Sequence, residues 1–156
     1  MAEFVGVQGT GHTPLAPEIL LTKWLNVLRA AQRYIRQIPD ERLTERVIDN
    51  RDRSIRLMSH HIFRIAEAFL ETAIDDVEYR VNNANVPPAE GTCTTGAEIV
   101  SYGTPPMHQL FERSIWHSAQ HTRQLIAVLE RFGIEPHGRL STEDLAGLPL
   151  AEGLWE

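Results

Sequence analysis

Apolar side chains recur every three or four residues along three long stretches of the chain. The first begins at Pro14 and Pro17, ends at Pro39, and carries Leu20, Leu21, Trp24, Leu25, Leu28, Ala31, Ile35 and Ile38. Because an α-helix has 3.6 residues per turn, this spacing places the apolar side chains on one helical face. Proline is accepted at the start of a helix but interrupts one internally, so the pattern predicts a first helix between these prolines.

Two later stretches show the same periodicity. The second predicted helix begins after an N-cap at Asn50 or Asp52 and ends near Tyr79 to Asn82. Its apolar side chains are Ile55, Met58, Ile62, Ile65, Ala66, Phe69 and Ile74. The other runs from about Met107 to Phe132, with Gly133 as its stop. Between them, residues 82–106 hold two proline pairs and three glycines, which leaves room only for a short helix near residues 97–102.

A C-terminal tail follows the third helix. Its residues Ser141 to Asp144 resemble a capping box, and apolar side chains that would close over the helices follow, namely Leu148, Leu150, Leu154 and Trp155. No window alternates with the period of two that marks a β-strand. The sequence therefore predicts an all-α, up-down helical bundle: a flexible segment at residues 1–13, then a single domain with a tail at residues 14–156.

Length, charge and cysteine content limit the classes of function that this chain can have. A chain of 156 residues suits one compact domain, and a net charge of −6 opposes binding to nucleic acid or an anionic membrane. No apolar run approaches the roughly 18 residues of a membrane span, and residues 1–12 lack the basic region of a secretory signal, so we expect a cytoplasmic protein. With Cys93 as the single cysteine, a metal ion must be held mainly by nitrogen and oxygen.

Two of the seven histidines, His117 and His121, stand four residues apart in the third predicted helix. Side chains at this spacing project from one face, and these two share the apolar stripe that continues through Leu125 and Val128. Unpaired imidazoles in an apolar core would cost several kcal/mol. A shared metal ion would satisfy one nitrogen of each ring. Hydrogen-bonded histidines without a metal are the alternative.

A third ligand is available on the second predicted helix. His60 and His61 are adjacent, so only one of them can face the core fully. We choose His61 because it shares the apolar face of Ile62 and Ile65, whereas His60 lies on the polar side as a surface residue or a contact of the site. Three histidines would bind one divalent ion, zinc or nickel first, iron or manganese otherwise, and leave a position open for catalysis.

Further side chains crowd the same turns of the third helix. As contacts with the metal ligands or with substrate we consider Glu112, Trp116, Gln120 and Arg123, and Gln124 lies beside them. The alternatives are an exposed carboxylate for Glu112, packing for Trp116, and a solvated or ion-paired surface arginine for Arg123. No separate general base is identifiable, so the catalytic residues stay open.

These residues suggest a family. RSIRLMSHHIFRIAEAFL, followed by ERSIWHSAQHTRQL, resembles the DinB/YfiT-like bundle proteins, and the tail LSTEDLAGLPLAEGLW resembles that of a branch with members fused to glutaredoxin-like domains. The resemblance covers about residues 14–155. It implies that His61, His117 and His121 bind one divalent metal ion. Known members include S-transferases of low-molecular-weight thiols and a thiol-dependent isomerase domain, which implies a thiol cofactor and a small-molecule substrate.

The chain departs from the family in one respect. Members place another long helix before the HxxxH helix, whereas residues 82–106 leave that third helix shortened or missing. We expect a second copy of the chain, in a homodimer, or the tail to cover the groove this leaves. The leading function is a metal-dependent enzyme that activates a low-molecular-weight thiol, as an S-transferase does, or water, as a hydrolase does. The alternative is a non-catalytic, stress-associated metal-binding or interaction protein.

Overall fold

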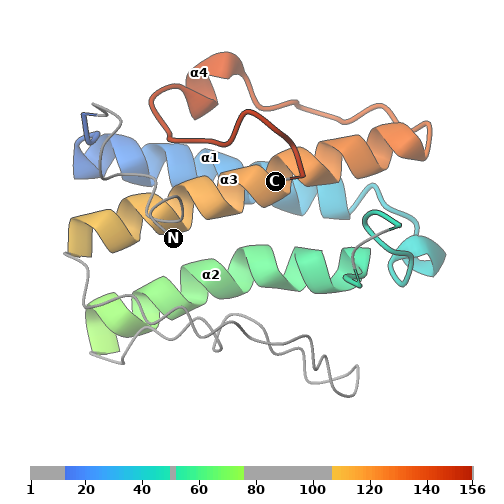
Figure 1. The fold of residues 1–156 in the computed structure, drawn as a ribbon, viewed down its shortest axis with the longest axis horizontal. Coiled ribbons are helices and arrows are strands. Elements are labelled where there is room, and N and C mark those ends of the chain that lie inside the picture. Colours follow the sequence, from blue (N-terminus) through green and yellow to red (C-terminus); the bar gives the residue numbers. More distant parts are fainter. Residues whose placement is uncertain (1–12, 50–51, 76–106, 156) are drawn as a thin grey trace.

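The computed structural model describes residues 13–49, 52–75 and 107–155, which form a bundle of three long helices (Figure 1). The long helices are α1 (Pro17–Ile35), α2 (Ile55–Asp75) and α3 (Met107–Arg131). Two short ones, η1 (Asp40–Arg42) and α4 (Thr142–Leu145), lie in the connection after α1 and in the tail. The chain runs along α1, returns along α2 and runs forward again along α3. The prediction of an all-α bundle is confirmed, and the described part contains no β-strand.

The helix ends follow from local sequence signals. Pro17 occupies the first turn of α1, where its missing N–H costs nothing. At the end of α3, Gly133 has a φ of 71°, and the amides of Gly133 and Ile134 donate to the carbonyls of Glu130 and Leu129. This is the Schellman arrangement, which a residue with a side chain would adopt only with strain. Gly133 therefore ends the third helix as predicted.

The predicted N-cap of the second helix was wrong. Ser54, not Asn50 or Asp52, caps α2, because its Oγ accepts a hydrogen bond of 3.1 Å from the amide of Leu57. Asp52 instead lies beside Arg46, whose guanidinium is 3.4 Å from its carboxylate. The antiparallel bridge between Arg46 and Ser54 sets where the helix begins, and a chain contact of this kind has no helical periodicity to reveal it.

Two apolar clusters fill the bundle, one toward each end. The first surrounds Tyr34 and comes from the end of α1, the start of α2 and the end of α3. The second surrounds Trp24, whose ring meets Phe69 and Phe111 edge to face at 5.4 and 5.7 Å between centroids. Helix α3 contributes to both clusters and packs closely on α1 and on α2, whereas α1 and α2 touch each other less. The inward face of α3 is therefore the centre of the molecule.

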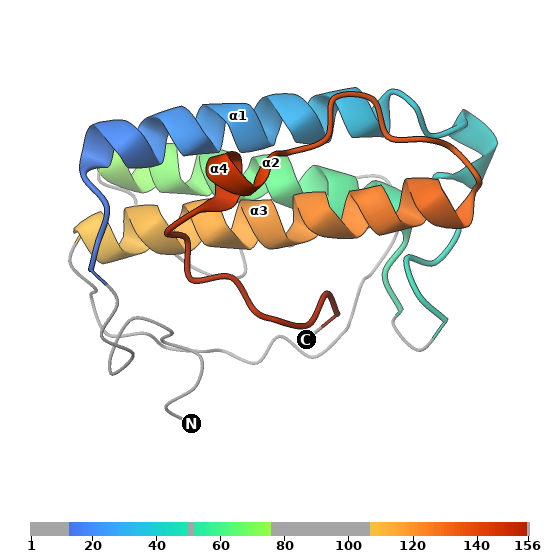
Figure 2. The same ribbon diagram turned by 90° about the horizontal axis from the view of Figure 1, so that it is seen from above.

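The C-terminal tail returns across α1 and α3 (Figure 2). Its capping box is confirmed: Ser141 Oγ accepts from the amide of Asp144, and the Asp144 carboxylate accepts from the amide of Ser141. The Asp144 carboxylate accepts from both the amide and the hydroxyl of Ser141, which favours its charged form and lowers the pKa of Asp144. Tyr34 fixes the tail to α1, since its hydroxyl donates to the carbonyl of Gly138 and accepts from the amide of Leu140. Leu148 is buried beyond that point.

Several predictions fall outside the described residues. They are the flexible segment as far as residue 12, the end of the second helix beyond Asp75, and the short helix near residues 97–102. The predicted shortened or missing third helix also lies outside the described residues. Among the described helices, none is long and apolar enough to cross a membrane.

Candidate metal centre

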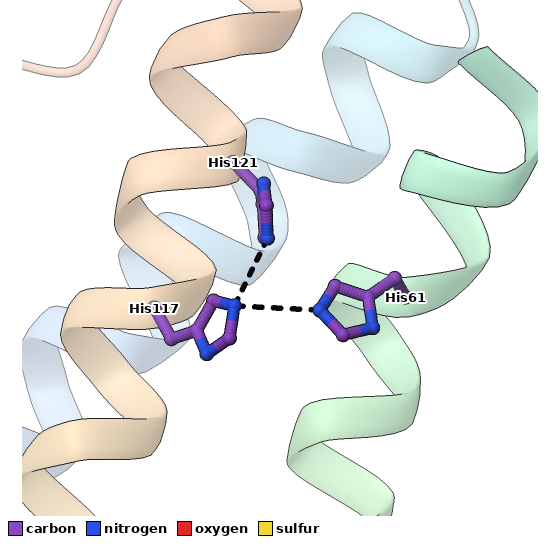
Figure 3. A group of neighbouring side chains, drawn as sticks. All are labelled: His61, His117 and His121. Atoms are coloured by element: carbon purple, nitrogen blue, oxygen red, sulfur yellow. Dashed lines mark hydrogen bonds between the residues drawn. The ribbon is translucent and has the colours of Figure 1, made fainter. Parts of the chain in front are cut away.

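Three histidine side chains converge between α2 and α3 (Figure 3). His61 comes from α2, and His117 and His121 come from successive turns of α3. The Nε2 atom of His117 lies 3.3 Å from Nε2 of His61 and 3.0 Å from Nε2 of His121. Each ring offers one ligand atom, and the three atoms lie within 4.8 Å of one another. The structure thus brings together the three residues that the sequence proposed as ligands.

Helix geometry and packing explain this convergence. Because His117 and His121 are four residues apart, they lie one above the other on the face of α3 that meets α2. Helix α2 runs in the opposite direction and presents His61 from between the core residues Met58 and Ile65. His61 and His121 are each 7% exposed, whereas His117 is half-buried. Solvent therefore reaches the group most readily at His117.

The environment keeps His117 neutral. Burial lowers the pKa of His117 well below its usual value of 6.5, and positive charge acts in the same direction from His121, His61, Arg113 and Arg53. A neutral imidazole has one ring nitrogen with a free lone pair, which is the form that binds a metal ion. A protonated ring here would face two other imidazoles at close range.

The spacing of His117 Nε2 from each of the other two Nε2 atoms fits a metal ion. Zinc–nitrogen bonds of ~2.0–2.1 Å at the tetrahedral angle hold two ligand nitrogens about 3.3 Å apart. The two Nε2 separations from His117, 3.3 and 3.0 Å, are close to that value. Without an ion, one Nε2 hydrogen on His117 could serve only one of its two neighbours. The three histidines are therefore positioned so that they could bind one divalent ion.

Polar side chains on α3 connect this group to the tail. Gln124 Oε1 lies 2.7 Å from Nδ1 of His121, and Gln124 Nε2 donates to the carbonyl of Leu154 at 2.8 Å. Gln120 Nε2 donates to the carbonyls of Gly153 and Leu154, each at 2.9 Å. The tail thus lies directly against the helix that carries two of the histidines.

Of the side chains proposed as contacts, Arg123 and Gln120 point to the tail. Arg123 donates to Oε1 of Gln120 at 2.8 Å and to the carbonyl of Ala151 at 3.0 Å. Trp116 stacks on His117, with 5.7 Å between ring centroids and 20° between planes. It is half-buried and also packs on the cluster around Trp24. Trp116 thus touches a histidine of the group.

Two proposed contacts lie in unexpected surroundings. Glu112 is fully buried, so the alternative of an exposed helix carboxylate was wrong. The sequence around Glu112 is polar and did not predict its burial. Glu112 is buried because side chains pack around most of the circumference of α3. His60 lies on α2 outside the histidine group, and its buried Nε2 has no hydrogen-bond partner in the described part of the chain.

Sequence reasoning assigned no role to Gln124. Its spacing was a usable signal, because a residue three positions after a histidine lies on the same helical face and can reach its ring. Its second partner, the carbonyl of Leu154, is 30 residues further along the chain and had no such signal. Cys93 and His12 lie outside the described residues.

Comparison with known proteins returned nothing: no protein-family model matches the chain, and no curated protein or solved structure matches it significantly. The geometry of the three histidines therefore carries the functional argument.

Proposed function

We propose that this chain is a DinB-like protein that binds one divalent metal ion through His61, His117 and His121. We propose further that it uses the ion to activate a low-molecular-weight thiol for attack on an electrophilic small molecule. The observation that carries the proposal is the convergence of three imidazole nitrogens at 3.0 and 3.3 Å between two helices. Zinc or nickel suits an all-imidazole donor set best, with iron or manganese as alternatives.

The number of ligands and the exposure of His117 support this chemistry. Three protein ligands leave a fourth position free, which distinguishes a catalytic site from a structural one. Held by these three histidines, a divalent ion would lower the pKa of a thiol or water bound at the free position. The partial exposure of His117 gives a small molecule access from that side, and the indole of Trp116, stacked on His117, offers an apolar surface for it.

The test is a metal-dependent thiol reaction. Full-length protein loaded in turn with zinc, nickel, iron or manganese is mixed with a panel of low-molecular-weight thiols and electrophiles, and thiol consumption is followed. We expect turnover with at least one pair, falling to background after chelation. His137→Ala is the matched control, because His137 is exposed and outside the histidine group. Turnover that survives full metal removal would contradict the proposal.

A metal hydrolase is the second candidate, because the same open position would activate water as readily as a thiol. Cleavage of activated esters without any thiol would favour it. Stoichiometric metal with neither reaction would favour the non-catalytic metal-binding or stress-associated interaction protein. In the cell, either enzyme would act on a small cytoplasmic molecule.

We also propose that the chain forms a homodimer through apolar side chains that α1 and α2 leave exposed. On α2 these are Phe63, Leu70 and Ile74, with exposed fractions of 39, 50 and 74%. On α1, Leu21 and Leu25 are 50 and 42% exposed. Within each helix these side chains share one face, and exposed apolar surface of this kind is typical of an interface. Sedimentation velocity should show a dimer that Leu70→Lys with Ile74→Lys converts to a monomer; a compact monomer for the unaltered chain would contradict the proposal.

A further inference from the structure

We propose that Gln124 is a positioning residue that sets the tautomer of His121, and that the C-terminal tail holds Gln124 in the orientation that this requires. The inference rests on the proposed metal site and deepens it, since it assigns the control of one ligand to a segment far away in sequence. Its observations are three hydrogen-bond contacts in series: Leu154 to Gln124, Gln124 to His121, and His121 to His117.

The orientation of the Gln124 amide is fixed by its surroundings. Gln124 is 3% exposed, so bulk water cannot replace its partners. One end of the amide lies 2.8 Å from the carbonyl oxygen of Leu154, and a carbonyl oxygen can only accept a hydrogen bond. The NH₂ group must face that oxygen, because the reversed amide would bring two oxygens together. The Oε1 atom therefore faces Nδ1 of His121, at 2.7 Å.

This orientation decides where His121 carries its hydrogen. Because Oε1 only accepts, Nδ1 of His121 must donate to it, and a neutral imidazole has a single N–H. The Nε2 atom of His121 is then left with its lone pair, directed at Nε2 of His117 at 3.0 Å. A lone pair on Nε2 is what a metal ligand at this place needs. Gln124 thus keeps His121 ready to bind an ion before any ion arrives.

The tail that fixes Gln124 is itself held by other side chains. Gln120 donates to the carbonyls of Gly153 and Leu154, and Arg123 donates to the carbonyl of Ala151. The carbonyl of Leu154 accepts from both glutamines, so its position does not depend on Gln124 alone. Any change that displaces the tail should therefore weaken metal binding, although no tail residue belongs to the histidine group.

The tautomer can be measured without a metal ion. Full-length, metal-free protein with ¹⁵N-labelled histidine, held about two units above the usual histidine pKa of ~6.5, gives long-range ¹H–¹⁵N spectra that distinguish the two tautomers. We expect His121 with its hydrogen on Nδ1. Gln124→Met should lose this preference. Gln124→Glu should keep it although its bond to Leu154 is lost, because either oxygen of a carboxylate accepts from Nδ1 and no amide orientation has to be fixed. Gln120→Met removes the two bonds of Gln120 to the tail and keeps those of Gln124, so it should change the tautomer in the same direction but less than Gln124→Met.

Metal affinity gives the second readout. Loss of an outer hydrogen-bond partner of a metal-bound histidine weakens binding by ~10–100-fold, and we expect this for Gln124→Met with zinc. Gln124→Glu should restore most of the affinity. Thermal melting checks that each variant is folded. Wild-type protein that binds no metal would refute the proposed site and leave the tautomer result standing. Wild-type tautomer and affinity in folded Gln124→Met would overturn the role of Gln124.

Discussion

Replacing His117 by alanine is expected to reduce divalent-metal affinity by more than the ~100-fold that loss of an outer hydrogen-bond partner can cause. His117 is the central member of the group, because its Nε2 is the atom that lies within 3.3 Å of both other Nε2 atoms. Without it, His61 and His121 offer two ligands from different helices, which is fewer than a stable zinc site uses. The measurement is metal stoichiometry by elemental mass spectrometry, with affinity from competition against a chelator.

Two neighbouring variants make the result specific. His60→Ala removes a histidine from the same turn of α2 as His61, and we expect the metal to be retained, because His60 lies outside the group. His61→Ala should lose it. The comparison therefore distinguishes metal binding at a defined three-histidine site from nonspecific metal binding by any histidine of the chain. Circular dichroism on each variant shows whether the bundle is intact, and a folded His117→Ala protein with a full complement of tightly bound metal would disprove the site.

Replacing Trp24 by alanine is expected to cost ~3–5 kcal/mol of unfolding free energy, the largest loss of stability we predict for one residue. The indole is 4% exposed, contacts the rings of Phe69 and Phe111, and donates from Nε1 to Oγ of Ser118 at 3.2 Å. Its removal leaves a cavity between α1, α2 and α3 and an unpaired hydroxyl on α3. Since domains of this size are stable by only ~5–15 kcal/mol, such a loss threatens folding itself.

Urea denaturation measures this effect, and two variants divide it into parts. Ser118→Ala keeps the indole but leaves its buried N–H without this acceptor, and should cost ~1–3 kcal/mol. Arg29 is exposed on α1, the helix that carries Trp24, so Arg29→Ala should change the free energy of unfolding by no more than ~0.5 kcal/mol. A Trp24→Ala protein as stable as Arg29→Ala would mean that the packing around the indole is not what holds the three helices together.

The sequence by itself determined the helices and the pairing of two histidines. Periodicity and proline placed α1 close to its observed bounds, and Gly133 marked the end of α3 within one residue. The common face of His117 and His121 also needed no structure. These features depend only on residues a few positions apart, because helical geometry fixes the relation between i and i+4. Membership of the DinB/YfiT-like family stays a prediction.

Only the tertiary structure decided which surfaces meet. It brought His61 to the two histidines of α3, buried Glu112 completely, and directed Gln120 and Arg123 to the tail. It also joined Leu154 to Gln124 across 30 residues. The physical reason is that the rotation of each helix about its axis and the path of the tail result from the packing of the entire core. The periodicity of the sequence shows which face of each helix is apolar, but not which other helix or segment packs against that face.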